Sequence, residues 1–259
     1  MPAVSPNDTS VIVITGASRG IGAAVARRLA ADAGEPTHLI INYAVNRAAA
    51  NAVVAEIEAS GNPVVASAVQ ADVGRADKVE NLFAAADEAG TLTGLVNNAA
   101  VVFPIGPFVD LTPERLQRSW AVNITGAFLC AREAVLRMST DRGGRGGSIV
   151  NVSSRAASFG SPNEFIDYAA SKGALDSMTR GLSTEVAAQG IRVNAVRPGL
   201  IDTDLHTAAG QPDRVNALAG KVPMRRGGTA DEVANLIVWM LSDEASYMTG
   251  ALVDIGGGR

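Results

Sequence analysis

The chain has 259 residues, of which 47% are hydrophobic and 19% are charged, a balance typical of a globular protein with a substantial core. A net charge of −4 without any basic block argues against nucleic acid and anionic membranes as partners, and one cysteine with two distant histidines argues against a metal site. The sequence has no apolar run of about 18 residues and no secretion signal at its start, so we expect a cytoplasmic protein.

Short apolar runs alternate with alanine-rich segments of helical period along the chain. Strands are predicted at residues 11–14, 38–42, 63–69, 94–97, 148–152, 191–196 and 251–255. Helices are predicted at about residues 21–33, 47–60, 75–90, 113–139, 167–189 and 230–242. Because strands that are apolar on both faces belong to a covered parallel sheet, this alternation predicts an α/β fold of the Rossmann type: a doubly wound parallel sheet of about seven strands with helices on both faces.

No long linker or break in composition divides the chain. We therefore expect an N-terminal tail over residues 1–10 and one domain over residues 11–259. Residues 204–226 are rich in glycine and proline and have weak periodicity. Because long irregular segments of compact domains are often lids, and this one follows the sixth predicted strand, we expect it to be a mobile lid over the site.

A glycine-rich turn, Thr15 to Gly22, lies between the first predicted strand and the first predicted helix. Glycines let the backbone approach a pyrophosphate, and the helix N-terminus offers free N–H groups to an anion. The spacing differs from the common Gly-x-Gly-x-x-Gly pattern. The candidate nucleotide contacts in the turn are Gly16, Ser18, Arg19, Gly20, Ile21 and Gly22.

Tyr168 and Lys172 are four residues apart in a predicted helix, so their side chains lie on one face, one turn from each other. A free phenol has a pKa of about 10, so proton exchange near neutral pH requires a lowering worth about 4 kcal/mol. One ammonium about 4 Å away supplies an interaction of that order at an effective dielectric of about 20. The pair therefore predicts a proton donor, and the alternative is a surface aromatic beside a solvated lysine.

With these motifs in hand, the chain closely resembles the short-chain dehydrogenase/reductase family in its single-domain form, from Val11 to the C-terminus. Residues 15–22 match the family's T-G-x-x-x-G-x-G turn, residues 97–100 are similar to its N-N-A-G motif, and residues 168–172 match its Y-x-x-x-K motif. Two departures concern the site. Ala100 stands in place of the usual glycine, and the interval from Ser154 to Tyr168 is one residue longer than is common in the family.

The resemblance implies catalytic roles for Asn123, Ser154, Tyr168 and Lys172. In hydride transfer to a carbonyl, an oxyanion develops that must be met by hydrogen-bond donors and by a proton. Ser154 would hydrogen-bond the carbonyl oxygen and Tyr168 would protonate it, while Lys172 would lower the pKa of the phenol and bind the nicotinamide ribose. Asn123 would hold a water that connects Lys172 to solvent.

The resemblance also implies a set of nicotinamide-cofactor contacts outside the glycine-rich turn. They are Tyr43, Arg47, Asp72, Val73, Asn98, Ala99, Tyr168, Lys172, Pro198, Gly199, Ile201 and Thr203. Sites specific for NAD place an acid at the end of the second strand, where it accepts the ribose 2′-hydroxyl and repels a 2′-phosphate. Tyr43 stands at that place here, and Arg19 and Arg47 are candidates for binding the phosphate. We therefore expect a preference for NADP(H), with NAD(H) as the alternative.

The sequence thus predicts an NAD(P)-dependent oxidoreductase that interconverts a secondary alcohol and a carbonyl on a small molecule. A sugar dehydrogenase resembling glucose 1-dehydrogenases and a 3-oxoacyl-carrier-protein reductase are the substrate alternatives, and a non-catalytic NADP-binding sensor is the alternative of another class. By resemblance, and because residues 121–138 and 169–182 are apolar beyond one face, we expect a homotetramer or a dimer. We interpret Trp120 and Trp239 as core packing and His206 as a solvated loop histidine.

Overall fold

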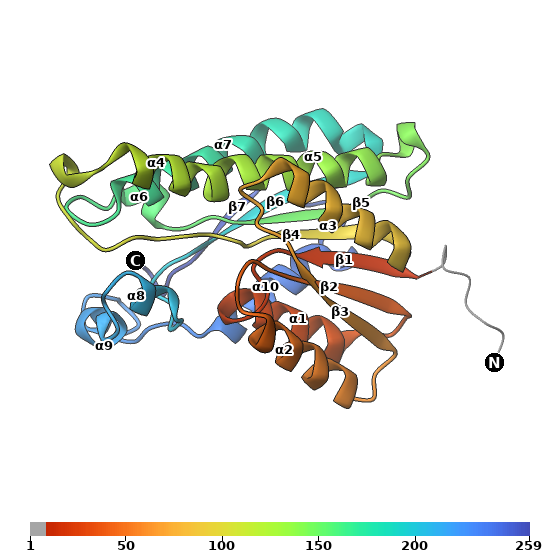
Figure 1. Cartoon of the computed structure of the whole chain (residues 1–259), viewed down its shortest axis with the longest axis horizontal. Helices are drawn as coiled ribbons and strands as arrows, with labels where there is room; N and C mark the ends of the chain where they lie inside the picture. The colour runs from red at the N-terminus through yellow and green to blue at the C-terminus, as the bar shows by residue number, and fades with distance from the viewer. Residues whose placement is uncertain (1–8) are drawn as a thin grey trace.

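Seven strands form one sheet in the order β3-β2-β1-β4-β5-β6-β7, and every pair of neighbours is parallel (Figure 1). The computed structural model describes residues 9–259. The strands are β1 (Ser10–Ile14), β2 (Thr37–Tyr43), β3 (Val64–Gln70), β4 (Thr91–Asn97), β5 (Gly147–Val152), β6 (Ile191–Pro198) and β7 (Leu252–Ile255). The strand order reverses between β1 and β4, and ligands of such sheets bind in the crevice at this switch point.

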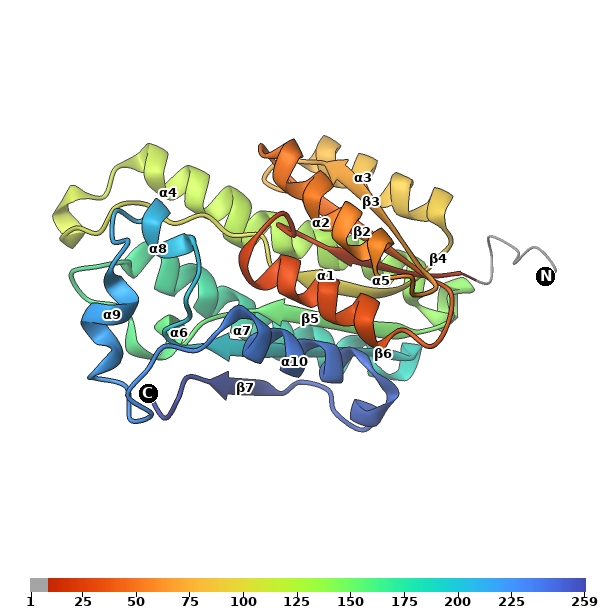
Figure 2. The ribbon, with the colours of Figure 1, turned by 90° about the horizontal axis from the view of Figure 1, so that it is seen from below.

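Helices cover both faces of the sheet (Figures 1 and 2). Apolar side chains of α1 (Gly20–Asp32), α2 (Arg47–Ala59) and α10 (Ala230–Leu241) pack on one face. Those of α3 (Ala76–Ala89), α5 (Ala127–Met138) and α7 (Ile166–Val186) pack on the other. The predicted fold class, a doubly wound parallel sheet, is confirmed.

Three short helices lie together beyond the carboxyl ends of the strands (Figures 1 and 2). They are α6 (Ala156–Phe159), α8 (Leu205–Ala208) and α9 (Arg214–Ala219). The segment predicted as a lid, residues 204–226, therefore contains two helices. Its two ends are joined, because Ile201 and Gly228 form a parallel bridge and Gly228 donates a hydrogen bond to the carbonyl oxygen of Leu200.

The helix predicted over residues 113–139 is not one regular α-helix. It consists of α4 (Pro113–Trp120), a π-helical segment, η3 (Ala121–Gly126), and α5. In a π-helical turn the backbone hydrogen bonds span five residues instead of four, and such turns are frequent at functional sites. The expected asparagine, Asn123, lies within this turn.

A buried row of polar side chains fixes α7 on the sheet. The Asn97 amide donates hydrogen bonds to the Ala127 carbonyl oxygen at 3.1 Å and to the Asn151 side-chain oxygen at 3.0 Å. The Asn151 amide in turn donates to the Thr179 hydroxyl at 2.9 Å. Because a buried amide without a partner costs several kcal/mol, these bonds define how α7 lies over β4 and β5.

The first strand, β1, begins at Ser10, one residue before the predicted start of the domain. Of the predicted tail, residues 1–8 lie outside the described residues. Of the helices within residues 9–259, none is both long enough and apolar enough to cross a membrane.

Candidate active site

A cavity of about 760 Å³ opens at the carboxyl ends of the strands. Its walls come from the glycine-rich turn, the end of β2, the loops after β3, β4, β5 and β6, and the start of α7. It brings together 17 of the candidate residues: Gly16, Ser18, Arg19, Gly20, Ile21, Tyr43, Asp72, Val73, Asn98, Ala99, Ser154, Tyr168, Lys172, Pro198, Gly199, Ile201 and Thr203. Gly22, Arg47 and Asn123 are not part of its wall.

The first and last glycines of the turn are required by close backbone approach. Gly16 has φ +63°, and a Cβ there would lie 2.9 Å from the Ala99 Cα. A Cβ on Gly22 would lie 2.6 Å from the Asn98 amide nitrogen and 2.8 Å from the Gly16 carbonyl oxygen. Gly22 therefore shapes the turn from behind rather than lining the cavity.

Polar side chains hold the glycine-rich turn against its neighbours. The Thr15 hydroxyl accepts hydrogen bonds from the backbone N–H groups of Asn98 and Ala99 at 2.9 and 3.0 Å. The Asn42 side-chain oxygen accepts from the Gly16 N–H at 3.1 Å, and its amide donates to the Ala71 carbonyl oxygen at 3.0 Å. Sequence reasoning missed Asn42, although an asparagine at the end of an apolar strand was a usable signal.

The end of β2 carries no carboxylate toward the cavity. Tyr43 is buried there, and the exposed Arg19 of the turn lines the same part of the wall. Arg47 is exposed at the first residue of α2, and it follows Asn46, whose side chain caps the helix by accepting from the Ala49 N–H. Arg47 is therefore next to the cavity wall but not part of it, and its contact with the nucleotide stays a prediction.

Asp72 is held in place after β3. One carboxylate oxygen accepts from the Gly74 N–H at 3.0 Å, and the other is 2.9 Å from the Arg118 guanidinium nitrogen. Arg118, like Asp72, lines the cavity. The carboxylate is thus oriented by α4 as well as by its own turn, and Arg118 is a second residue that sequence reasoning missed.

The side chains of Ser154 and Tyr168 both line the cavity and lie close enough for the Ser154 hydroxyl to influence the pKa of the Tyr168 phenol. The Ser154 hydroxyl also accepts from the Ala156 N–H at 3.1 Å, which orients it at the start of α6. Desolvation raises the pKa of Tyr168 to about 12, and the Ser154 hydroxyl acts in the opposite direction. The pKa of Tyr168 is thus raised in this structure, in contrast to the expected lowering, and Lys172 is not among the groups that shift it.

The position of Lys172 explains this difference. Its ammonium nitrogen donates to the Val152 carbonyl oxygen at 2.6 Å and lies 5.4 Å from the centroid of the Tyr168 ring, over its face. The side chain is 2% exposed, and burial lowers the pKa of Lys172 to about 8, while the Asp176 carboxylate raises it. Desolvation, which the sequence cannot reveal, thus acts on both members of the pair.

Asn123 uses its side chain to hold a neighbouring loop. Its oxygen accepts from the Val101 N–H at 2.8 Å, and its amide donates to the Val101 carbonyl oxygen at 2.9 Å and to the Ser171 hydroxyl at 3.3 Å. Val101 lines the cavity and Asn123 does not. The side chain therefore ties the loop after β4 to α7, and its role in holding a water near Lys172 stays a prediction.

The cavity wall also contains aromatic side chains and an ion pair between Glu164 and Arg214, which we call the clasp. Phe159 and Phe165 line it, and Phe165 lies edge-on to Tyr168 with centroids 6.4 Å apart. The Arg214 guanidinium of α9 donates to both carboxylate oxygens of Glu164. Sequence reasoning missed these residues, because they lie in the irregular segments and meet only in the folded chain.

The loop between α6 and α7 has a strained backbone. Ser161 and Asn163 adopt positive φ values of 44° and 61°, which are uncommon for residues other than glycine. Such strain concentrates at ligand-binding sites. The loop lies where the sequence has its extra residue, and Ser161 lines the cavity.

His206 is not the solvated loop histidine that we expected. Its ring nitrogen Nε2 is 2.9 Å from the Ile201 carbonyl oxygen, and the side chain is half-buried in the cavity wall. Burial lowers the pKa of His206. Burial therefore favours the neutral form of this ring in the cavity wall.

Comparisons with known proteins agree with this geometry. Residues 16–259 match a family model described as enoyl-(acyl carrier protein) reductase. The uncharacterized oxidoreductase YgfF of Escherichia coli (strain K12) is 49% identical over 251 residues, which cover 96% of this chain and 100% of that protein. The 3-oxoacyl-(acyl-carrier-protein) reductase FabG of Staphylococcus aureus (strain Mu50) is 34% identical over 255 residues, covering 96% of this chain and 98% of that one.

Solved structures give the same result. A short-chain dehydrogenase from Burkholderia cenocepacia J2315 in complex with NADP has a TM-score of 0.84 and 35% identity, and the match covers 95% of this chain and 96% of that one. The reductase LugOII, described as catalysing keto-reduction, has a TM-score of 0.84 and 36% identity, with 98% of each chain covered. The chain is therefore an oxidoreductase that belongs to the short-chain dehydrogenase/reductase family.

Proposed function

We propose that the protein interconverts a secondary alcohol and a carbonyl, with a nicotinamide cofactor as the hydride carrier and Tyr168 as the acid and base. The observation that carries this proposal is that the hydroxyls of Ser154 and Tyr168 lie close together in the wall of a cavity that also contains the glycine-rich turn. Two hydroxyls that converge on one point form a binding site for a carbonyl oxygen.

In the reducing direction, the carbonyl oxygen accepts hydrogen bonds from the hydroxyls of Ser154 and Tyr168. The chemistry supplied by a bound nicotinamide is delivery of a hydride to the carbonyl carbon. The negative charge then develops on the oxygen, and Tyr168 donates its proton there to give the alcohol. A tyrosine whose pKa lies at about 12 is protonated at neutral pH and is thus ready to act as the acid.

For the cofactor, we propose a preference for NADP(H) over NAD(H). Support comes from the end of β2, where Tyr43 stands in place of an acid, and from Arg19, the basic residue of the turn, which lines the same wall. A 2′-phosphate there meets a guanidinium and no carboxylate. The NADP bound to the Burkholderia cenocepacia relative is consistent with this proposal.

For the substrate, we favour a carbonyl compound with an apolar substituent. The cavity wall carries Phe159, Phe165, Leu205 and Ala209, which suit an acyl or aromatic group better than the hydroxyls of a sugar. The similarity to 3-oxoacyl-(acyl-carrier-protein) reductases supports a 3-oxoacyl thioester as the first compound to test. A non-catalytic sensor is disfavoured, because nucleotide binding alone has no use for the converging hydroxyls.

The test is a substrate panel with the purified protein. NADPH and NADH are each combined with 3-oxoacyl thioesters, aromatic ketones and aldoses, and nucleotide oxidation is followed by absorbance. We expect turnover of an apolar carbonyl compound with NADPH, and at least roughly 100-fold slower turnover by Ser154→Ala, which removes one of the two donors. Binding of NADPH without turnover of any compound would favour the sensor, and turnover of aldoses alone would favour a sugar dehydrogenase.

A further inference from the structure

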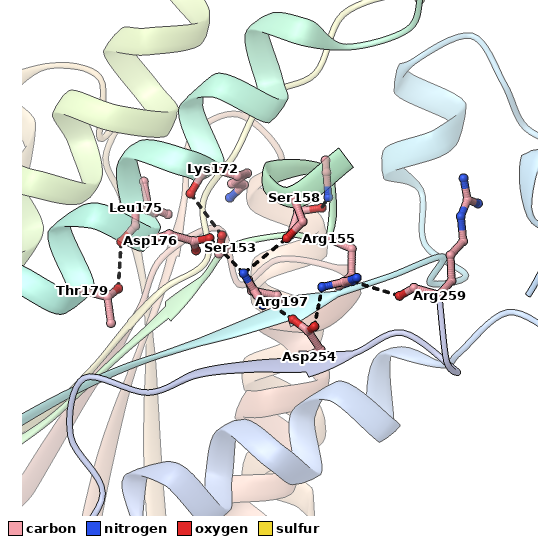
Figure 3. A network of polar contacts seen from close by, with 12 residues as sticks. Ser153, Arg155, Ser158, Lys172, Leu175, Asp176, Thr179, Arg197, Asp254 and Arg259 are labelled. Atoms are coloured by element: carbon pink, nitrogen blue, oxygen red, sulfur yellow. Dashed lines mark hydrogen bonds and ion pairs between the residues drawn. The ribbon is translucent and has the colours of Figure 1, made fainter. Parts of the chain in front are cut away.

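A buried carboxylate lies directly behind the candidate catalytic pair. Asp176 is on α7, four residues after Lys172 and eight after Tyr168, so the three side chains follow one stripe of the helix. Asp176 is only 7% exposed. One of its oxygens, Oδ1, is buried and has no hydrogen-bond partner among the described residues, and the other is 3.5 Å from an Arg197 guanidinium nitrogen (Figure 3).

We propose that Asp176 is a positioning residue, whose carboxylate keeps the buried ammonium of Lys172 charged beside Tyr168; the catalytic consequence of this rests on the proposed function. The Y-x-x-x-K motif ends at Lys172 and does not include Asp176. The proposed chemistry does not require Asp176 to contact a substrate. Its action is through Lys172 alone.

The burial of Lys172 shows why such a carboxylate is needed. An ammonium has three N–H donors, and within residues 9–259 this one makes a single hydrogen bond, to the Val152 carbonyl oxygen. Burial of a charged group favours its neutral form unless an opposite charge is close. Asp176 is the group that raises the pKa of Lys172 against desolvation.

The other charges around Lys172 are already paired with each other (Figure 3). Arg197 on β6 donates to Asp254 on β7 at 2.6 Å, and Asp254 also pairs with Arg155, which follows Ser154. On the opposite side, Asp167 forms a two-bond pair with Arg115 of α4, at 2.9 Å for each bond. Since Arg197 is shared with Asp254 and its contact with Asp176 is long, the Asp176 charge remains available to Lys172.

The proposal predicts different changes of the Lys172 pKa for substitutions of its two neighbours, Asp176 and Arg197. In Asp176→Asn, the pKa of Lys172 falls by about 1 to 2 units, the shift expected for losing one unit charge about one helical turn away. In Arg197→Gln, which removes a positive charge, the Lys172 pKa stays at the parent value or rises. A role of Asp176 that is only to hold Arg197 in place would give both variants the same effect.

The chain offers a direct measurement, because Lys78, Lys172 and Lys221 are its only lysines. Protein labelled with ¹³C at lysine Cε gives three NMR signals, and the Lys172→Met variant identifies the one from Lys172. The signal is titrated with pH in the nucleotide-free protein. Glu185→Gln is the matched control, since it removes a carboxylate from an exposed position of the same helix.

We expect the Lys172 signal to titrate near pH 8 in the parent, at lower pH in Asp176→Asn, and near the parent value in Glu185→Gln and Asp176→Glu. A Lys172 titration in Asp176→Asn that coincides with that of the parent overturns the proposal. If that variant does not fold, a fall of the Lys172 pKa in Arg197→Gln overturns it equally.

Activity provides the second readout. The high-pH limb of kcat/KM should move to lower pH in Asp176→Asn by the same amount as the NMR titration, and Asp176→Glu should restore it. An NMR shift without any shift of the limb contradicts the catalytic part of the proposal. If the parent shows no turnover with any carbonyl compound, the proposed function fails while the NMR result still decides the electrostatic role of Asp176.

Discussion

The guanidinium of Arg214 donates two hydrogen bonds to the carboxylate of Glu164, at 3.1 and 2.5 Å, and thereby joins α9 to the loop before α7. Both residues line the cavity. The Arg214 guanidinium also lies 5.2 Å from the centroid of the Phe165 ring. This clasp, the Glu164–Arg214 pair, joins the segment that we predict to be a lid, residues 204–226, to the loop before α7.

We expect the lid to open when the clasp is broken and to become more ordered when the cofactor binds. In Glu164→Gln, amide hydrogen exchange over residues 204–226 should be faster than in the parent, and NADPH should slow it in both proteins. Glu56→Gln is the control, because it breaks an exposed pair with Arg27 far from the lid. Exchange that is equally slow in the parent with and without NADPH contradicts a mobile lid.

Arg19 and Arg47 should differ in their effect on cofactor preference. Arg19 lines the cavity and Arg47 does not, so Arg19→Ala should lower kcat/KM with NADPH by roughly 10- to 150-fold, the range for losing one charge-assisted hydrogen bond of about 1.5 to 3 kcal/mol. The efficiency with NADH should stay within a few-fold. Arg47→Ala serves as the matched control and should resemble the parent. An NADH preference in the parent, or an unchanged Arg19→Ala variant, contradicts this assignment.

The buried Lys172 should make stability rise with pH. Its pKa is about 8 in the folded protein and 10.5 in a free lysine, so between these values the unfolded chain binds more protons than the folded one. The free energy of unfolding of the parent, relative to Lys172→Met, should therefore increase by about 2 kcal/mol from about pH 7.5 to about pH 9.5. Above pH 10 the raised pKa of Tyr168 acts in the opposite direction, so the window ends there.

Denaturant titrations of both proteins across this window provide the measurement. The difference between parent and Lys172→Met isolates the lysine from the other titrating groups. A difference that is constant with pH would show that Lys172 is not buried as a charge in solution.

We expect the protein to assemble as a homotetramer. Trp120 on α4 and Phe128 on α5 are 44% and 46% exposed, which corrects the interpretation of Trp120 as core packing and leaves an apolar surface beside the segment 121–138. Trp239 is likewise 38% exposed. Light scattering at micromolar concentration should give four chain masses for the parent and a smaller assembly for the double variant Trp120→Ser, Phe128→Ser.

The control for assembly is Val65→Ser, which changes an exposed apolar residue on the edge strand β3. It should keep the mass of the parent. A single-chain mass for the parent would rule the tetramer out, and two chain masses would favour the dimer that we left as the alternative.

The fold was predictable from sequence because its signals are local. The apolar runs at residues 11–14 and 148–152 and the alanine-rich segments between strands carry the pattern of a covered parallel sheet. Helical spacing alone placed Tyr168 and Lys172 one turn apart. The glycine-rich turn could also be predicted from the sequence. Gly16 and Gly22 are required there by close contacts with Ala99 and Asn98, which follow β4.

The rest of the site depends on tertiary contacts that the sequence does not display. Phe159, Glu164 and Arg214 come from segments whose sequence shows no clear periodicity, and they line one cavity only in the folded chain. The absence of Arg47 from the cavity wall could likewise not be predicted from the sequence. The pKa of Tyr168 depends on desolvation, and the sequence pattern shows the nearby ammonium but not the loss of water.

The position of Asp176 on the helix could be predicted from the sequence, but its burial could not. Its spacing from Lys172 was visible as a third member of the helical stripe. Its burial depends on Arg197 and Asp254, which arrive from β6 and β7. A search for an acidic residue one helical turn after Lys172 would have identified Asp176.

The measurement that tests the account most directly is the rate of hydride transfer by Tyr168→Phe under single-turnover conditions, with NADPH and the best carbonyl compound of the panel. We predict that cofactor affinity stays within a few-fold of the parent and that the rate falls by at least roughly 100-fold, because the phenyl ring keeps the packing but has no proton to give. Near-normal hydride transfer by the folded variant would contradict the assignment of Tyr168 as the acid.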